Sequence, residues 1–107
     1  MWILLEIIKF HVIYSYMNVV SLQKIINKLV LPKYDWIVSY EIDSFYYRPF
    51  ENFRVVYYVD SPDITDKEDE VKKVEKLTEN LFEVLGPVGT QVLRGVVFEY
   101  DEDRVKN

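Results

Sequence analysis

The chain has no cysteine, one histidine, three glycines and four prolines among its 107 residues. The lack of cysteine excludes disulfides, thiolate nucleophiles and zinc sites built on cysteine. His11 is the only histidine available as the base of a nucleophilic triad, and it lies in an apolar segment where a packed or surface role is the default. Neither phosphate-binding glycine motif, Walker or dinucleotide, is present. We therefore expect a protein that is not an enzyme and that binds no cofactor or metal.

What the chain does have is apolar and aromatic bulk: 50% of its residues are hydrophobic and 16% are aromatic. That is enough for a real core in a chain whose length supports one domain. The net charge of −5 is unevenly placed, because residues 1–59 hold 5 acidic and 6 basic side chains, whereas residues 60–107 hold 13 and 7. The acidic second half argues against broad phosphate binding, which needs a basic surface.

Residues 1–17 form an apolar N-terminal arm in which Glu6 and Lys9 interrupt the hydrophobic run. The run is too short and too charged for a membrane span, and it lacks the basic start and cleavage site of a secretory signal. A strand or helix that packs in the core or in an interface is the favoured interpretation, with Trp2 and Phe10 as contact residues, and attachment to a membrane surface is the alternative. Met17 is an alternative start.

The elements that follow are indicated by periodicity. A helical pattern with one apolar face runs from Asn18 to Val30 and is stopped by Pro32. Residues 36–47 alternate as a strand, with Trp36, Val38, Tyr40 and Ile42 on one face. Residues 48–52 form a connection, and residues 53–59 form the returning strand of a hairpin.

Residues 60–66 are a loop, and Thr65 to Glu68 has the form of a capping box at the start of a helix. The predicted buried stripe of that helix is Val71, Val74, Leu77, Leu81, Val84 and Leu85. Gly86 ends the helix and Pro87 prevents its continuation. Residues 91–100 form a third strand, in which Gly95 allows a bulge or a close approach.

The sequence therefore predicts an α+β fold in the order αββαβ: a three-stranded sheet covered by two helices. An extension of the sheet by the N-terminal arm stays open. The helix between the second and third strands is long enough for a right-handed crossover, which would make these strands parallel neighbours. The predicted organisation is the arm at 1–17, one domain at 18–100 and a charged tail at 101–107.

Gly86-Pro87-Val88-Gly89 fits a G-x-x-G loop, and with the αββα order before it the chain resembles the KH family of RNA-binding domains. The resemblance implies that this loop clamps a nucleic-acid backbone. In KH domains, however, the loop joins two helices and is usually basic, whereas here a strand follows an acidic helix. A helix stop and turn is the simpler interpretation.

Two groups of carboxylates are candidate sites. Glu41 and Asp43 share a strand face and are suitable as paired carboxylates or metal ligands, but a solvated strand face is the favoured explanation. Asp60, Asp63, Asp66 and Glu68 are rich in oxygen ligands but lack the spacing of a calcium loop. A loop and a helix cap explain them.

The best functional signal is a cluster of aromatic and arginine residues around the hairpin, of the types that anchor protein interfaces: Trp36, Tyr46, Tyr47, Arg48, Phe50, Arg54 and Tyr58. A tyrosine-rich sheet packed under its own helices remains the plain alternative. We predict protein–protein interaction, as an adaptor or as an assembly subunit that forms oligomers. A virus or mobile-element structural protein is one form that the composition permits.

The alternative function is a small nucleic-acid-binding module that uses the aromatic sheet with Arg48, Arg54 and Arg94. It is disfavoured by the acidic charge. The expected location is the cytoplasm or a virion.

Overall fold

The computed structural model of the chain describes the backbone of residues 19–47, 50–85 and 91–106, and the side chains of residues 19–43, 54–84 and 95–105. A first helix covers residues 19–29. The further elements are β1 (Ile37–Tyr47), β2 (Phe50–Val59), the 3-10 helix η1 (Thr65–Lys67), α2 (Glu68–Leu85), β3 (Gln91–Tyr100) and α3 (Glu102–Lys106). This is the predicted α+β fold in the predicted order, with one further short helix at the end.

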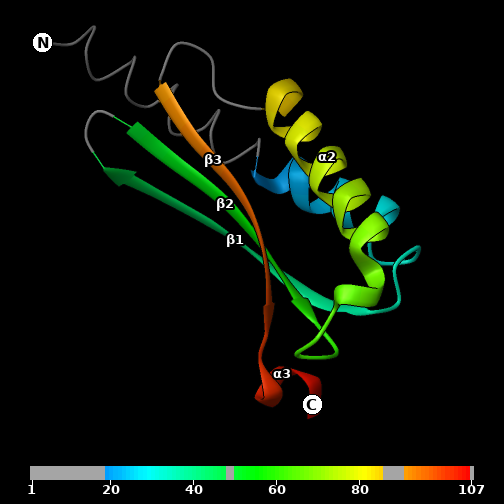
Figure 1. Cartoon of the computed structure of the whole chain (residues 1–107). Coiled ribbons are helices and arrows are strands. Elements are labelled where there is room, and N and C mark those ends of the chain that lie inside the picture. Colours follow the sequence, from blue (N-terminus) through cyan, green and yellow to red (C-terminus); the bar gives the residue numbers. More distant parts are fainter. Residues whose placement is uncertain (1–18, 48–49, 86–90, 107) are drawn as a thin grey trace, which may run out of the picture.

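The three strands form one mixed sheet in the order β1-β2-β3. β1 and β2 are an antiparallel hairpin, and β2 pairs with β3 in parallel through the α2 crossover, as predicted. β2 begins at Phe50, so the predicted connection at 48–52 is too long: Phe50 to Asn52 already pair with Tyr47 to Phe45. Both longer helices lie on the same side of the sheet (Figure 1).

A β-bulge at Val38 changes which side chains of β1 face the core. Ile37 pairs with Val59 and Ser39 pairs with Tyr58, so Val38 is left without a partner in the register. Because one extra residue reverses the alternation, Ile37 is buried while Val38 is 41% exposed. The prediction that Val38 shares the face of Tyr40 and Ile42 is therefore wrong.

The core lies between the sheet and the two longer helices. The first helix contributes Leu22 and Ile26, and α2 contributes Val74 and Phe82. The sheet contributes every second residue of β2, namely Val55, Tyr57 and Val59. Tyr40 of β1 also connects the sheet to the first helix, since its hydroxyl donates to Asn27 Oδ1 at 2.9 Å and has the carbonyl oxygen of Gln23 as a second acceptor within reach at 3.2 Å.

The buried line of α2 differs from the predicted stripe. Val74, Thr78 and Phe82 are its buried residues, and their spacing of four places them one above another on one face. Val84 is 79% exposed, because two positions beyond Phe82 a helix has turned to its far side. Val71, Leu77 and Leu81 flank the line and are partly buried, as predicted.

The start of α2 is also built differently from the predicted capping box. The carboxylate of Asp63 accepts hydrogen bonds from the Thr65 backbone N–H at 3.0 Å and from the Thr65 hydroxyl at 2.8 Å. Thr65 lies in η1, and the residue that precedes η1, Ile64, makes no side-chain cap. The prediction of a reciprocal Thr65–Glu68 cap is wrong, because Thr65 is the first residue of η1 and not the residue that precedes a helix.

Gly95 provides a stability prediction. The β2–β3 register is continuous past it, and a Cβ built there would lie 3.8 Å from Arg54 Cγ, an ordinary contact. Neither the predicted bulge nor a close approach is therefore present. Gly95→Ala should raise the free energy of unfolding by about 0.5–1 kcal/mol, because alanine loses less backbone entropy on folding. Urea denaturation measures this, and a loss of stability would show that the strand needs glycine.

Candidate functional site on the polar sheet face

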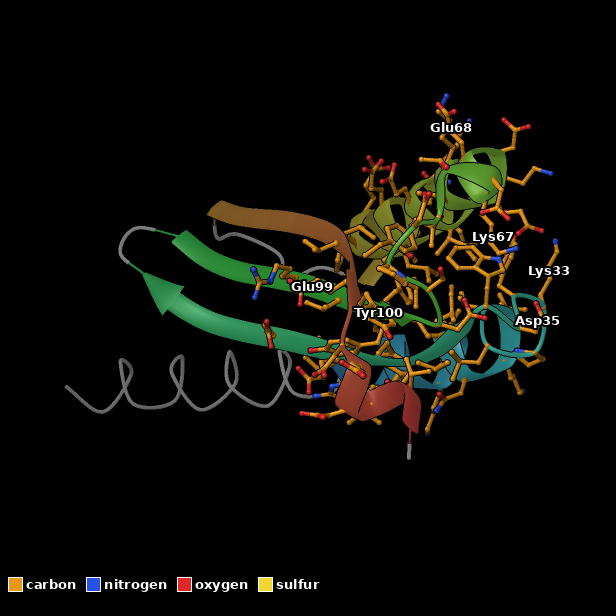
Figure 2. All side chains as sticks on the ribbon, turned by 60° about the horizontal axis from the view of Figure 1, so that its bottom comes forward. Lys33, Asp35, Lys67, Glu68, Glu99 and Tyr100 are labelled. Carbon is orange, nitrogen blue, oxygen red and sulfur yellow. The ribbon has the colours of Figure 1, made fainter. Side chains whose placement is uncertain are left out.

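The side of the sheet opposite the two longer helices carries ionised and hydroxyl side chains. We call it the polar sheet face and define it by Glu41, Asp43, Arg54, Tyr58 and Glu99. The register brings these residues together, since Asp43 pairs with Arg54 and Tyr58 pairs with Glu99. Glu99 and the neighbouring Tyr100 lie near the end of β3, where the chain turns into α3 (Figure 2).

Asp43 and Arg54 form an ion pair across the hairpin. Arg54 Nη2 lies 2.8 Å and Nε 3.3 Å from Asp43 Oδ2, so two donors share one carboxylate oxygen. The hydrogen bond to Asp43 raises the pKa of Arg54. Both side chains keep substantial exposure, so the pair adds little stability. The pair matters for the electrostatics of the face, because the positive charge of Arg54 is already balanced by Asp43.

Glu41, Tyr58 and Arg104 form a second cluster. The Tyr58 hydroxyl donates to Glu41 Oε2 at 2.9 Å, and Arg104 Nη2 donates to the other oxygen of the same carboxylate. The Arg104 guanidinium carbon lies 4.0 Å from the centre of the Tyr58 ring, a cation–π contact. Arg104 Nε is 3.6 Å from Asp101 Oδ2. The hydrogen bond to Glu41 raises the pKa of Tyr58.

Arg104 reaches this position because the last residues fold into α3. Asp101 starts the helix, with its carboxylate accepting from the backbone N–H of Asp103 at 3.0 Å and its carbonyl oxygen accepting from Arg104 and Val105. Sequence reasoning treated residues 101–107 only as a charged tail and so missed Arg104. Asp101 followed by an acidic first turn is the helix-start signal that could have indicated it.

The predicted contact residues are distributed as follows. Arg54 and Tyr58 lie on the polar sheet face. Trp36 is only 2% exposed and packs against Tyr34 and Phe98, so it belongs to the core rather than to a contact surface. The backbones of Tyr46, Tyr47 and Phe50 lie in β1 and β2. The side chains of these three residues, and Trp2, Phe10 and Arg48 altogether, lie outside the described residues, as do the N-terminal arm and His11.

The charges on this face do not favour a polyanion. This face and the adjoining turn carry four carboxylates, those of Glu41, Asp43, Glu99 and Asp101. The two guanidinium groups beside them, Arg54 and Arg104, are both already paired with carboxylates. Among the arginines of the nucleic-acid alternative, the structure describes the side chain of Arg54 alone. The segment that resembles a KH loop, 86–89, lies outside the described residues, and the chain passes there from α2 into strand β3.

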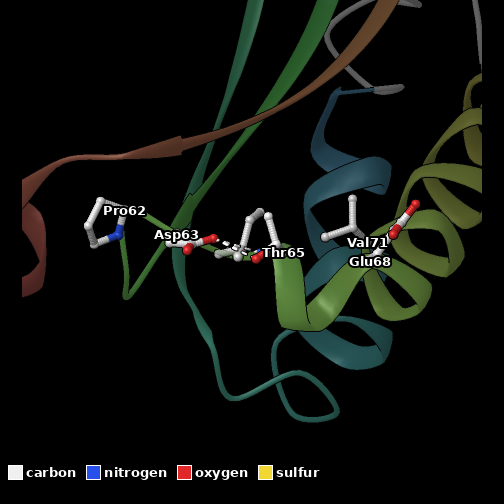
Figure 3. Close-up of a pocket in the computed structure, with 6 residues that line it drawn as sticks. Pro62, Asp63, Thr65, Glu68 and Val71 are labelled. Carbon is white, nitrogen blue, oxygen red and sulfur yellow. Dashed lines mark hydrogen bonds between the residues drawn. The ribbon is translucent and has the colours of Figure 1, made fainter.

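A hollow of about 360 Å³ lies between the 60–66 loop and the start of α2 (Figure 3). Its lining comprises Pro62, Asp63, Ile64, Thr65, Glu68 and Val71. The Asp63 carboxylate accepts hydrogen bonds there from the backbone N–H and the hydroxyl of Thr65, and these bonds lower the pKa of the Asp63 carboxyl. The polar groups of this hollow therefore hold the loop in shape.

Within the part of the chain that the structure describes, no three His, Cys, Asp or Glu residues are grouped so that they could hold a metal ion. None of the described helices is both long enough and apolar enough to cross a membrane. No protein family model, curated protein or solved structure matches the chain.

Proposed function

We propose that the chain is a protein–protein interaction subunit that associates with further copies of itself through the outer edge of β3. The observation that carries this proposal is a difference in burial between paired strands. Val55, Val56 and Tyr57 of β2 are buried, whereas their partners Val96, Val97 and Phe98 in β3 are only half-buried. The apolar surface thus continues to the edge of the sheet.

The edge itself is suited to strand addition. Among the described residues no strand pairs with the outer side of β3, which is ten residues long. Soluble proteins usually protect such an edge with lysine, proline or a bulge. β1, the other edge strand, has such a bulge at Val38. β3 contains neither lysine nor proline, its register is continuous, and its two charged residues, Arg94 and Glu99, lie outside the run Val96-Val97-Phe98.

A second copy is the partner to which these features point. Two β3 strands that pair antiparallel about a two-fold axis present the same surface to each other, which is the simplest closed arrangement. Backbone hydrogen bonds would supply affinity, and the half-buried Val96, Val97 and Phe98 would be covered further. The polar sheet face would then extend across both copies.

The test is the mass of the full chain in solution as a function of concentration, by sedimentation or native mass spectrometry. Val97→Lys should weaken self-association by more than about tenfold, because a charge on an edge strand opposes pairing. Val84→Lys is the matched control: it makes the same change at the exposed far side of α2 and should associate like the wild type.

Circular dichroism should show both variants folded. A wild-type chain that is monomeric up to millimolar concentration would refute the proposal. So would a folded Val97→Lys chain that associates as strongly as Val84→Lys.

A further inference from the structure

We infer that Glu41, Tyr58 and Asp101 form a binding site for the guanidinium group of an arginine on a partner protein, and that Arg104 fills this site in the isolated chain. The inference rests on the proposed interaction function, since it assigns a second contact site to the same sheet. We call these three residues with their resident group the guanidinium seat.

The geometry of the seat is specific for arginine. Glu41 offers one oxygen to Arg104 while Tyr58 holds the other, so the carboxylate is fixed in orientation. The Tyr58 ring lies against the flat guanidinium group at 4.0 Å, and Asp101 Oδ2 lies 3.6 Å from Nε. A planar cation with several donors satisfies all three, whereas a lysine ammonium has no flat face to place on the ring.

The resident group, the Arg104 guanidinium, belongs to a short helix at the surface. α3 spans only Glu102–Lys106, and a helix of five residues is not stable in water on its own. Glu102, Asp103 and Arg104 are exposed to solvent. α3 therefore depends on its contacts with the rest of the chain, and the docking of Arg104 onto Glu41 and Tyr58 is one of them.

Release would uncover a surface that fits a basic partner segment. Tyr58 is 8% exposed with Arg104 in place. Without Arg104, Glu41, Glu99 and Asp101 would lie around an accessible aromatic ring. Among the side chains of this face that the structure describes, Arg54 would be the remaining cation, and it is paired with Asp43. Such a surface attracts a positively charged segment and offers one ring against which an arginine can lie.

The test uses the full chain and a short capped peptide whose only charged side chain is one arginine. NMR titration follows the Tyr58 ring signals. Arg104→Ala should bind this peptide about tenfold more tightly than the wild type, because the internal competitor is gone. A peptide with lysine in place of arginine should bind several-fold more weakly.

Arg54→Ala is the matched control, since it removes the same charge from the same face but not from the seat. It should bind the peptide like the wild type. Glu41→Gln added to Arg104→Ala should abolish the gain. Equal gains in Arg54→Ala and Arg104→Ala, equal binding of both peptides, or no gain in Arg104→Ala would each overturn the inference.

The inference about the guanidinium seat and the proposed association through β3 can be refuted independently of each other. Val97→Lys leaves the seat intact and should bind the peptide as the wild type does, whether or not the chain associates through β3. If Arg104→Ala itself abolishes self-association, Arg104 acts between copies rather than as an internal competitor, and the inference is overturned.

Discussion

Trp36→Ala should lower the free energy of unfolding by about 3–5 kcal/mol, the usual loss for removing a buried large aromatic side chain. Trp36 is 2% exposed and joins separate parts of the core. Its ring centre lies 6.1 Å from that of Tyr34 and 6.0 Å from that of Phe98, so it connects the segment before β1 with β3. Urea denaturation followed by circular dichroism measures the change.

Trp36→Phe separates packing from hydrogen bonding. Trp36 Nε1 is buried and has no hydrogen-bond partner in the described part of the chain, so phenylalanine loses no bond and removes an unpaired donor. We expect a cost of only about 1–2 kcal/mol, from the smaller ring. A cost equal to that of Trp36→Ala would contradict this view and indicate a polar partner for Nε1.

The parts of the fold that the sequence predicted depend on local pattern. The alternation of residues 36–47 and the apolar period of the two longer helices are carried by neighbours along the chain. The length of α2 and the stop at Gly86 and Pro87 then favour a crossover and parallel β2 and β3, as the register confirms. These features need no knowledge of distant contacts.

The parts that were missed depend on pairing between distant residues. The bulge at Val38 is defined only against Val59 and Tyr58, so alternation alone placed Ile37 on the wrong face. Thr78 was omitted from the buried stripe because threonine is polar. Its burial depends on Tyr57, which is 21 positions away.

The polar sheet face was predicted only in part, because its contacts also join residues that are far apart in the sequence. Residue type alone indicates Arg54 and Tyr58 as contact residues, and strand alternation alone indicates Glu41 and Asp43 as part of a solvated face. Only the hairpin register shows that Asp43 pairs with Arg54 and that Glu41 accepts a hydrogen bond from Tyr58. Arg104 was missed because its contact with Glu41 spans 63 positions.

The Tyr57–Thr78 pair leads to the second large prediction. Both side chains are fully buried, and their hydroxyl oxygens are 2.6 Å apart. The Thr78 hydroxyl donates to the Val74 carbonyl oxygen at 2.8 Å, so its single proton is used there and Tyr57 must be the donor to Thr78. Tyr57 therefore depends on Thr78 as its acceptor, whereas Thr78 keeps a partner without Tyr57.

This asymmetry predicts unequal mutational costs. Thr78→Val preserves the shape of the side chain but leaves the buried Tyr57 hydroxyl without an acceptor. It should lower the free energy of unfolding by about 2–3 kcal/mol. Tyr57→Phe leaves Thr78 bonded to Val74 and should cost about 1 kcal/mol. The double variant should cost less than the sum of the two, because no hydroxyl is then left unpaired. Additive costs would mean that the two hydroxyls are not coupled.

The same burial makes the protein sensitive to alkali. Burial raises the pKa of Tyr57 from its usual value near 10 to about 12. The folded state thus favours the neutral phenol, and the stability due to this preference is complete below pH 10 and lost as the pH rises towards 12. The full loss is about 3 kcal/mol by linkage. Unfolding free energies measured between pH 9 and 12 should fall less steeply in Tyr57→Phe than in Tyr58→Phe, the adjacent variant, which retains Tyr57. If both variants lose stability equally over this range, Tyr57 is not the group responsible.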